Sequence, residues 1–382
     1  MNRRAGLFFV LFVLYAGVRL VPFFFVFDNT ARFLLAGSSE YSELGADIAQ
    51  HDSYASVWPG TAPARAPGYP FFLSMVYRAF GVQPAIALFF QIVLSGLVPI
   101  FLYLNAELLL SRRAARIASF LSVFEPLSIV YAAALLPWTI GTLLLLVSTY
   151  FFIVSLKKKD TASFFLSAVV AGAAAYVLPV MLYVPLVYAA VYIAASWLSL
   201  RDRLKYALGI VVVAGLTLAP WVVRNYTVSG YKGFCPAPLA VAARGAASTL
   251  SAPLRRDVSR LAGIKPAPGG AVLRVHHARS AGSALLSGPS IVKEVGVYQD
   301  VFAVVTALLA MMGIVVVAGE GFLRELLLLL LMIAYPVVVS EEPVAGPGNR
   351  LAMLPYVLIM ASAGISALFT SVSSKHYKKR IK

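Results

Sequence analysis

Five carboxylates gather in one polar stretch of an otherwise apolar chain. They lie in the segment 28–81 and are Asp28, Glu40, Glu43, Asp47 and Asp52. The whole chain has only 16 Asp and Glu against 32 Lys and Arg, so this concentration requires a chemical explanation. A carboxylate placed beside a substrate hydroxyl can accept its proton. We therefore treat this segment as the source of a general base.

Arginines at the ends of apolar runs supply the complementary charge. Arg224 and Asn225 closely follow Trp221 at such an end, and Arg65 and Arg350 are similar candidates. A guanidinium can hold a phosphate through two hydrogen bonds while its stem stays in the membrane interface. The alternative for Arg224 is an anchor for the helix end, with Trp221 in the aromatic belt.

Transmembrane helices must position these groups. The chain is 60% hydrophobic and 13% charged, whereas soluble domains are about half apolar. Apolar runs of about 20 residues match the length needed to cross a hydrocarbon core. We expect an all-α polytopic bundle of about ten transmembrane helices, near residues 6–27, 84–107, 114–133, 138–156, 161–178, 180–199, 206–223, 299–318, 323–340 and 351–370.

Clusters of basic residues orient this bundle. They fall on one side of the predicted spans, at residues 3–4, 112–116, 157–159, 201–205 and 375–382. The positive-inside rule makes that side cytoplasmic. We therefore predict a single domain, 1–382, in the inner or plasma membrane, with both termini in the cytoplasm and two large outer segments, 28–83 and 224–298.

The formal net charge of +16 does not indicate a nucleic-acid partner, because about half of it comes from these connections. The outer segment 224–298 is different, with ten Lys or Arg against Asp257 and Glu294. An anionic partner such as a lipid phosphate would explain it, and so would the solubility of a loop. Its prolines and glycines predict a mobile cover, a lid, with one short helix over 253–261.

The first outer segment should contain two interfacial helices. Residues 39–50 show acidic and apolar faces at helical spacing: Glu40, Glu43 and Asp47, and Tyr41, Leu44 and Ile48. Phe71–Phe80 is too short to span and should lie along the surface before Pro84 starts the next span. Tyr69, at the turn into this piece, could pack there or line an acceptor groove.

Two charged residues fall inside predicted spans at equal depth. Arg19 and Glu125 each lie roughly 13 Å below the outer end of their helix, by helix rise. An unpaired charge at that depth costs at least a few kcal/mol. We predict that they form a buried ion pair or share a polar cavity.

Metal ligands are not evident. The single cysteine, Cys235, excludes a cysteine cluster. His51, His276 and His277 fall in the outer segments, but no His and carboxylate set has ligand spacing. No cofactor is assigned, and a divalent cation stays open.

The chain resembles the GT-C membrane glycosyltransferases over nearly its whole length. The resemblance follows the acidic segment and three sequences, ARAPGYPFFLSMVYRAFG (64–81), APWVVRNY (219–226) and GNRLAMLPYVLIMASAGI (348–365). Each of these motifs lies in the order and on the membrane side that this family requires. It is most similar to bacterial relatives of the protein O-mannosyltransferases and lipid A aminoarabinose transferases.

The resemblance implies a donor sugar on a polyprenyl phosphate and inverting transfer at the extracytoplasmic face. A lipid, glycan or protein would be the acceptor, and an Asp or Glu of the first loop would be the base. Relatives usually carry that Asp about four residues before the Tyr matching Tyr41, where this chain has Gly37. Glu40 or Asp28 would substitute. The segment 136–139 also lacks an acid often found in relatives, which weakens the argument for a metal.

Two alternatives differ in class. A ligase or polymerase of lipid-linked glycans also has many spans and a basic outer loop, but its first outer loop need not be acidic. An inactive scaffold or transporter would fit the missing Asp. A transporter should have ionisable groups along a path at the midplane, whereas the polar residues here gather at the outer edge. Sugar transfer is therefore the favoured hypothesis.

Overall fold

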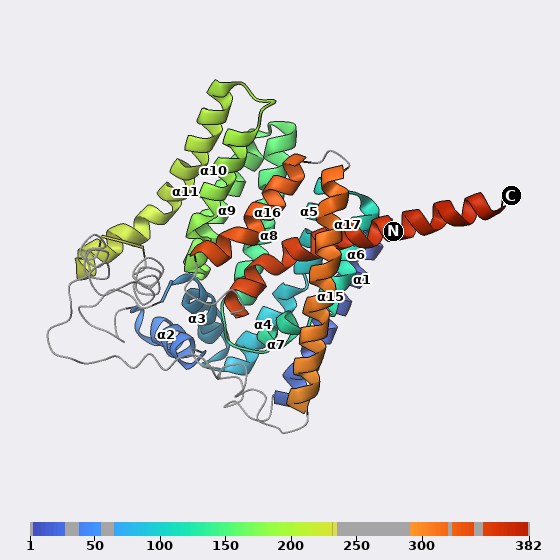
Figure 1. Ribbon diagram of the computed structural model, residues 1–382. Coiled ribbons are helices and arrows are strands. Elements are labelled where there is room, and N and C mark those ends of the chain that lie inside the picture. Colours follow the sequence, from blue (N-terminus) through green and yellow to red (C-terminus); the bar gives the residue numbers. More distant parts are fainter. Residues whose placement is uncertain are drawn as a thin grey trace, which may run out of the picture.

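The computed structural model describes residues 3–26, 38–54, 65–230, 232–234, 291–319, 323–339 and 347–380. Every regular element in these ranges is a helix (Figure 1). The helices are α1 (Arg3–Val26), α2 (Ser38–His51), α3 (Gly68–Phe80), α4 (Pro84–Ser95), α5 (Val98–Leu109), α6 (Arg112–Val123), α7 (Pro126–Ala132), α8 (Trp138–Lys158), α9 (Thr161–Val177), the 3-10 helix η2 (Pro179–Tyr183), α10 (Val184–Ala194), α11 (Leu200–Ser229), α15 (Ile291–Gly319), α16 (Leu323–Val339) and α17 (Pro347–Arg380).

The predicted class, an all-α membrane bundle, is confirmed. Within the described ranges, six helical units are long and apolar enough to cross a membrane, or seven if the bent pair α6–α7 is one span. The other three predicted spans coincide with shorter apolar helices, at Thr161–Val177, Pro179–Ala194 and Glu325–Pro336.

Two predicted spans are interrupted, which hydropathy did not reveal. The span at 84–107 is divided by a turn into α4 and α5, which still form one apolar unit, Pro84–Leu109. The span at 114–133 divides into α6 and α7, which meet at an angle of 53°. A proline begins or closely follows the start of the second helix in both cases, at Pro99 and Pro126. Because proline disfavours helical geometry in the residue before it, Glu125 is extended, with φ −69° and ψ 116°.

Close backbone contact joins α15 to α17. A Cβ atom on Gly313 would lie 1.9 Å from the carbonyl oxygen of Met360, and one on Gly364 would lie 2.4 Å from that of Leu309. Small residues allow this approach between helices in a membrane, where packing and not apolar burial drives association. The helix that follows the basic outer segment is thus fixed to the bundle.

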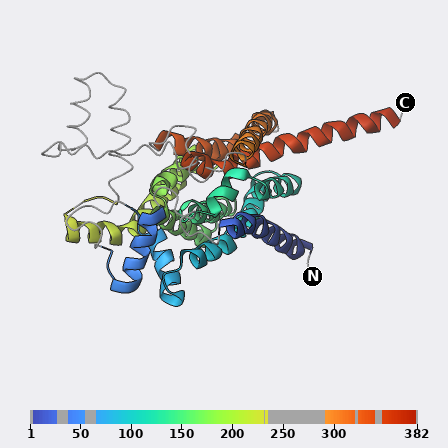
Figure 2. The same cartoon turned by 90° about the horizontal axis from the view of Figure 1, so that it is seen from below.

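Helices α2 and α3 lie together at one end of the molecule, as both Figure 1 and Figure 2 show. The amphipathic prediction for α2 is confirmed, since Tyr41, Leu44 and Ile48 are buried. A Cβ on Gly45 would lie 2.7 Å from the Cβ of Leu73, so glycine allows α2 to rest directly on α3. This packing sets the position of the first turn of α2.

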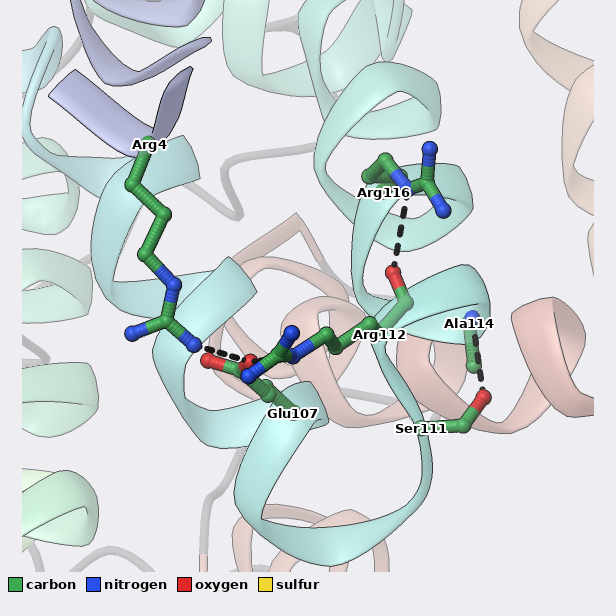
Figure 3. A network of polar contacts seen from close by, with 6 residues as sticks. All are labelled: Arg4, Glu107, Ser111, Arg112, Ala114 and Arg116. Atoms are coloured by element: carbon green, nitrogen blue, oxygen red, sulfur yellow. Dashed lines mark hydrogen bonds and ion pairs between the residues drawn. The ribbon is translucent and has the colours of Figure 1, made fainter. Parts of the chain in front are cut away.

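A clasp at a basic connection holds α1, α5 and α6 together (Figure 3). The carboxylate of Glu107 accepts hydrogen bonds from Arg4 of α1 and, at 2.9 Å, from Nε of Arg112 at the start of α6. Ser111 caps α6 by accepting from the backbone N–H of Ala114 at 3.2 Å. One carboxylate therefore offsets two of the clustered cations.

Replacing Glu107 with Gln should lower the free energy of unfolding by about 1–2 kcal/mol, because hydrogen bonds to charged groups contribute about 1.5–3 kcal/mol and the exposure of both arginines reduces that contribution. Thermal unfolding of the purified protein in detergent measures the change. The loss should shrink at 1 M salt, since the pair is partly exposed. Glu43→Gln removes a carboxylate without an ion pair to any described residue and serves as control; equal melting temperatures for both variants would contradict the clasp.

Candidate functional site at the α2, α3 and α11 end

Glu40 lies in the first turn of α2, where the helix dipole favours a negative charge. Both Nε and Nη2 of Arg65 donate to its Oε2, at 2.9 and 2.8 Å. The other oxygen, Oε1, has no hydrogen-bond partner within the described ranges, and 57% of the side chain is exposed. Arg65 thus orients the carboxylate and leaves one oxygen facing outward.

An aromatic platform supports the Glu40–Arg65 pair. The guanidinium carbon of Arg65 lies 5.2 Å from the centre of the Tyr41 ring, within cation–π range. Tyr41 in turn packs edge-on against Tyr69, with 5.3 Å between ring centres. The pair therefore stands on the packed contact between α2 and the start of α3.

Tyr69 belongs to the interior and not to an open groove. It is fully buried and donates its hydroxyl to Oε1 of Gln91 at 2.7 Å. The amide of Gln91 donates to the carbonyls of Ala132 and Ala134, at 3.2 and 2.9 Å, which ties α3 to the end of α7. Burial raises the pKa of Tyr69 well above its ordinary value. Its expected contact with a substrate is not supported, and it has the environment of a packing residue.

Arg224 of α11 lies against a different pair of rings, those of Trp221 and Tyr54. Its guanidinium carbon is 4.9 Å from the Trp221 ring centre and 5.5 Å from that of Tyr54. Tyr54 packs edge-on against Trp221 and donates its hydroxyl to the carbonyl oxygen of Arg65 at 2.8 Å. Tyr54 therefore links the segment that orients Glu40 to the helix that carries Arg224.

Asn225 holds the residues that follow α11 against this helix. Its buried amide donates to the carbonyls of Gly233 and Phe234, each at 3.0 Å. Trp221 donates its indole N–H to the Phe234 carbonyl at 3.1 Å. Among the described residues, the Arg224 guanidinium donates to the Asn225 side-chain oxygen, at 3.5 Å. Asn225 thus folds residues 232–234 back on α11, and the direct phosphate contact expected of it is not favoured by this arrangement.

Several predicted site residues lie where the structure gives no side-chain description. Asp28, His276, His277 and the predicted short helix at 253–261 fall outside the described residues. Arg350 lies in the first turn of α17, but its side chain is not among those described. One boundary is corrected, since α11 continues to Ser229 and α15 begins at Ile291, inside the stretch 224–298 expected to be a loop.

Arg19 binds the broken span between α6 and α7. This fully buried side chain donates to the carbonyls of Ser122 and Val123, at 3.2 and 3.1 Å, and to the hydroxyl of Ser128. Tyr298 donates to the next carbonyl, that of Phe124, at 2.9 Å. The last carbonyls of α6, which have no partner within their own helix, are satisfied from α1 and α15.

Glu125 acts on the other side of the break. It accepts from the backbone N–H groups of Leu127 and Ser128, at 3.0 and 2.5 Å, and so caps α7. A direct salt bridge with Arg19 is not among those formed by the described residues. Both side chains instead line one cavity of about 30 Å³, which corresponds to the second of the two predicted arrangements. The ion pair is therefore corrected to two separate helix-end contacts.

The described residues contain no group of three or more His, Cys, Asp or Glu that could hold a metal ion. His51 pairs with Asp47 of its own helix, with 3.3 Å between Nδ1 and Oδ1. The described residues therefore provide no ligand set for the divalent cation that the sequence left open.

Sequence reasoning missed Tyr54 and Gln91. Gln91 carries a signal, because an amide inside an apolar span must find partners and so marks a contact between helices. Tyr54 carries almost none. It stands in a polar segment, and only the fold brings it against Trp221.

A family model described as dolichyl-phosphate-mannose-protein mannosyltransferase matches residues 64–223, less than half of the chain. This range includes Arg65 and ends just before Arg224. No curated protein matches the sequence at a significant level.

Several solved structures share the fold. The oligosaccharyltransferase of Archaeoglobus fulgidus without ligand has a TM-score of 0.64 and 14% identity. The same archaeon's AglB, with an inhibitory peptide and dolichol-phosphate, has 0.62 and 12%. ArnT of Cupriavidus metallidurans, bound to undecaprenyl phosphate, has 0.57 and 16%.

The shared part is one portion of those proteins. The similarity covers 100%, 100% and 93% of this chain, but 52%, 52% and 60% of the three structures in the same order. The chain thus spans little more than half their length. At 12–16% identity the likeness concerns the fold.

Proposed function

We propose that this chain, which is similar to the GT-C glycosyltransferases and has their fold, transfers a sugar from a polyprenyl-phosphate donor to an acceptor at the extracytoplasmic face. One observation carries the proposal. Arg65 holds one carboxylate oxygen of Glu40 and leaves the other open, and Tyr54 donates to the backbone carbonyl of Arg65 while its ring lies under Arg224. Tyr54 thus connects the segment that orients a base to the helix that carries an anion-binding group.

In the proposed reaction, Glu40 is the general base. As the acceptor oxygen bonds to the anomeric carbon, Oε1 takes the hydroxyl proton, and the bond from that carbon to the phosphate oxygen breaks. Attack opposite the leaving group inverts the anomeric centre. A general base of this kind is worth about 100- to 10,000-fold in rate. Asp28 stays the alternative base.

Arg224 is the proposed phosphate ligand. The departing polyprenyl phosphate keeps the electron pair and needs a cation, not an acid. Two aromatic rings hold the Arg224 guanidinium, and its N–H groups can still form the two-pronged contact that phosphate favours. We propose Arg350 as a second ligand, Asn225 and Arg65 as positioning residues, and the segment between α11 and α15 as a cover that excludes water.

We further propose that both termini are cytoplasmic and that this site faces outward. The basic connections, including the Glu107 clasp and Lys157 to Lys159, support this orientation through the positive-inside rule. The polyprenyl-phosphate and dolichol-phosphate ligands of ArnT and AglB support the kind of donor. The sugar and the acceptor stay open.

Binding of undecaprenyl phosphate and turnover of its labelled sugar derivatives test the proposal. Wild-type protein in nanodiscs should bind undecaprenyl phosphate. When it is given undecaprenyl phosphate that carries a sugar, it should transfer the sugar and release the free lipid phosphate. Arg224→Gln should weaken binding about tenfold or more, since charge-assisted hydrogen bonds contribute about 1.5–3 kcal/mol. Lys232→Gln is the matched control, because Lys232 is an exposed cation on the same side. Equal affinity of wild type and Arg224→Gln would remove Arg224 from the site.

One observation favours a second candidate, a catalytically inactive lipid-binding protein. Gly37 stands where relatives usually carry the base, and Glu40 is already engaged by Arg65. The same experiment separates the two functions. Binding of undecaprenyl phosphate without turnover of any sugar-loaded donor would support the scaffold over the enzyme.

A further inference from the structure

A second cavity lies far from the Glu40 cluster. It has a volume of about 420 Å³ and is lined by Leu109, Ile153, Leu156, Lys157, Trp197, Glu325 and Leu328. These residues come from the ends of α5 and α8, the turn before α11 and the start of α16. Arg224 lies 24 residues along α11 from Leu200, which is up to about 36 Å of helix rise. This site is independent of the proposed function.

Lys157 supplies a cation with unused capacity. Its ammonium donates to the carbonyl of Leu108 at 2.6 Å and pairs with Oε1 of Glu325 at 3.0 Å. A lysine ammonium has three N–H donors. The third has no acceptor among the described residues, and 39% of the side chain is exposed. The lysine can therefore bind one more anionic oxygen.

Glu325 supplies the opposite charge. It lies in the first turn of α16 and is only 13% exposed. Its partner in the described part of the chain is Lys157, which contacts Oε1 and not Oε2, and Glu325 lines the cavity. A carboxylate can accept about four hydrogen bonds, and each one that a largely buried carboxylate gains stabilises its charge. The cavity thus presents an open acceptor and an open donor side by side.

The rest of the wall is apolar, with Trp197 among leucines and an isoleucine. Tryptophan at the end of transmembrane helices lies at the depth of lipid head groups. A volume of 420 Å³ falls within the usual range of ligand pockets, about 300–1,000 Å³. The shape and location therefore fit an amphiphile from the bilayer itself.

We propose that this cavity binds a phospholipid with a primary ammonium head group, of the phosphatidylethanolamine class. The lipid ammonium would donate to Oε2 of Glu325, the phosphate would accept from Lys157, and the first acyl carbons would contact Leu156 and Leu328. An anionic lipid without an ammonium would leave Glu325 unmatched and place like charges together. A choline head group has no N–H to donate.

The test is a head-group series on the full-length protein in detergent after delipidation. Phosphatidylethanolamine, its N-methyl and N,N-dimethyl forms, phosphatidylcholine and phosphatidylglycerol are compared with identical acyl chains. Native mass spectrometry measures retained lipid, and thermal unfolding measures stabilisation. The N-methyl and N,N-dimethyl forms should still be retained, because each keeps an N–H, and retention should fall to about a tenth for phosphatidylcholine, which loses the charge-assisted hydrogen bond. Glycerophosphoethanolamine, which lacks acyl chains, should not stabilise the protein.

Variants locate the site. Glu325→Gln should bring the retention ratio of phosphatidylethanolamine to phosphatidylcholine close to one. Lys158→Gln, which removes the neighbouring exposed charge outside the cavity, should leave the ratio unchanged. Equal retention of both lipids by wild type, or tightest retention of phosphatidylglycerol, would overturn the proposal. If Glu325→Gln does not fold, the comparison of the methylated head groups on the wild-type protein tests the proposal by itself.

Discussion

Replacing Glu40 with Gln is expected to slow sugar transfer by about 100- to 10,000-fold while the affinity for undecaprenyl phosphate stays unchanged. Gln has the shape of Glu, and its side-chain oxygen can still accept from Arg65. It cannot take up the acceptor proton, so only the chemical step should suffer. Single-turnover kinetics with a sugar-loaded donor separates that step from lipid binding.

Glu43→Gln is the matched control for this substitution. Glu43 is exposed on the same helix, one turn further on, and its loss should leave the rate within twofold, about 0.4 kcal/mol. Asp28→Asn tests the alternative base. Full turnover by Glu40→Gln together with a large loss in Asp28→Asn would move the role to Asp28 and leave Glu40 as a surface partner of Arg65.

Replacing Arg19 with Leu should lower the free energy of unfolding by about 3–5 kcal/mol, the usual cost of removing one partner from a buried charged network. The carbonyls of Ser122 and Val123 would lose their donors in the protein interior, and Glu125 would lose the nearby positive charge. Unfolding in mixed micelles with increasing SDS measures this change.

Arg19→Lys and the double variant Arg19→Leu with Glu125→Leu serve as comparisons. Lysine keeps the charge but not the fork that reaches several acceptors, so it should lose only part of the stability. The double variant should be less destabilised than the sum of the single changes, because both residues contact Ser128 and line one cavity. Additive losses would show that Arg19 and Glu125 hold their helix ends independently.

Much of the fold follows from hydropathy alone. A bilayer requires long apolar helices, so all ten predicted spans coincide with helices or helix pairs. The faces of α2 were also predictable, since Tyr41, Leu44 and Ile48 recur at helical spacing and are buried. These features depend on local pattern, which a single sequence displays in full.

The interruptions of two of these spans were less visible in the sequence. Average hydropathy stays high across Gly96 and across Glu125, so each interrupted span reads as one run. The local signal was the proline that follows, at Pro99 and Pro126. Proline is tolerated in membrane helices when other groups satisfy the freed backbone, and Arg19 does this from α1. That compensation depends on tertiary structure, which periodicity cannot show.

The candidate site was likewise predictable only in part. Glu40, Arg65 and Arg224 stood out by charge and position, but their relationship did not. Arg65 was predicted to bind phosphate, and the contact that the structure shows is with Glu40, 25 residues away in the chain. Tyr54 joins both to α11 through a hydrogen bond and a ring contact that only the folded chain creates.

The partners of Arg19 also bear on how this protein is made. They lie 103 to 109 residues further along the chain. At a synthesis rate of about 5–20 residues per second, they emerge from the ribosome roughly 5–20 s after Arg19. During that interval α1 carries an arginine without its interhelical partners, at a cost of at least a few kcal/mol at the bilayer centre. We expect α1 to settle at its final depth only after the segment around Ser122 and Ser128 has been translated and inserted.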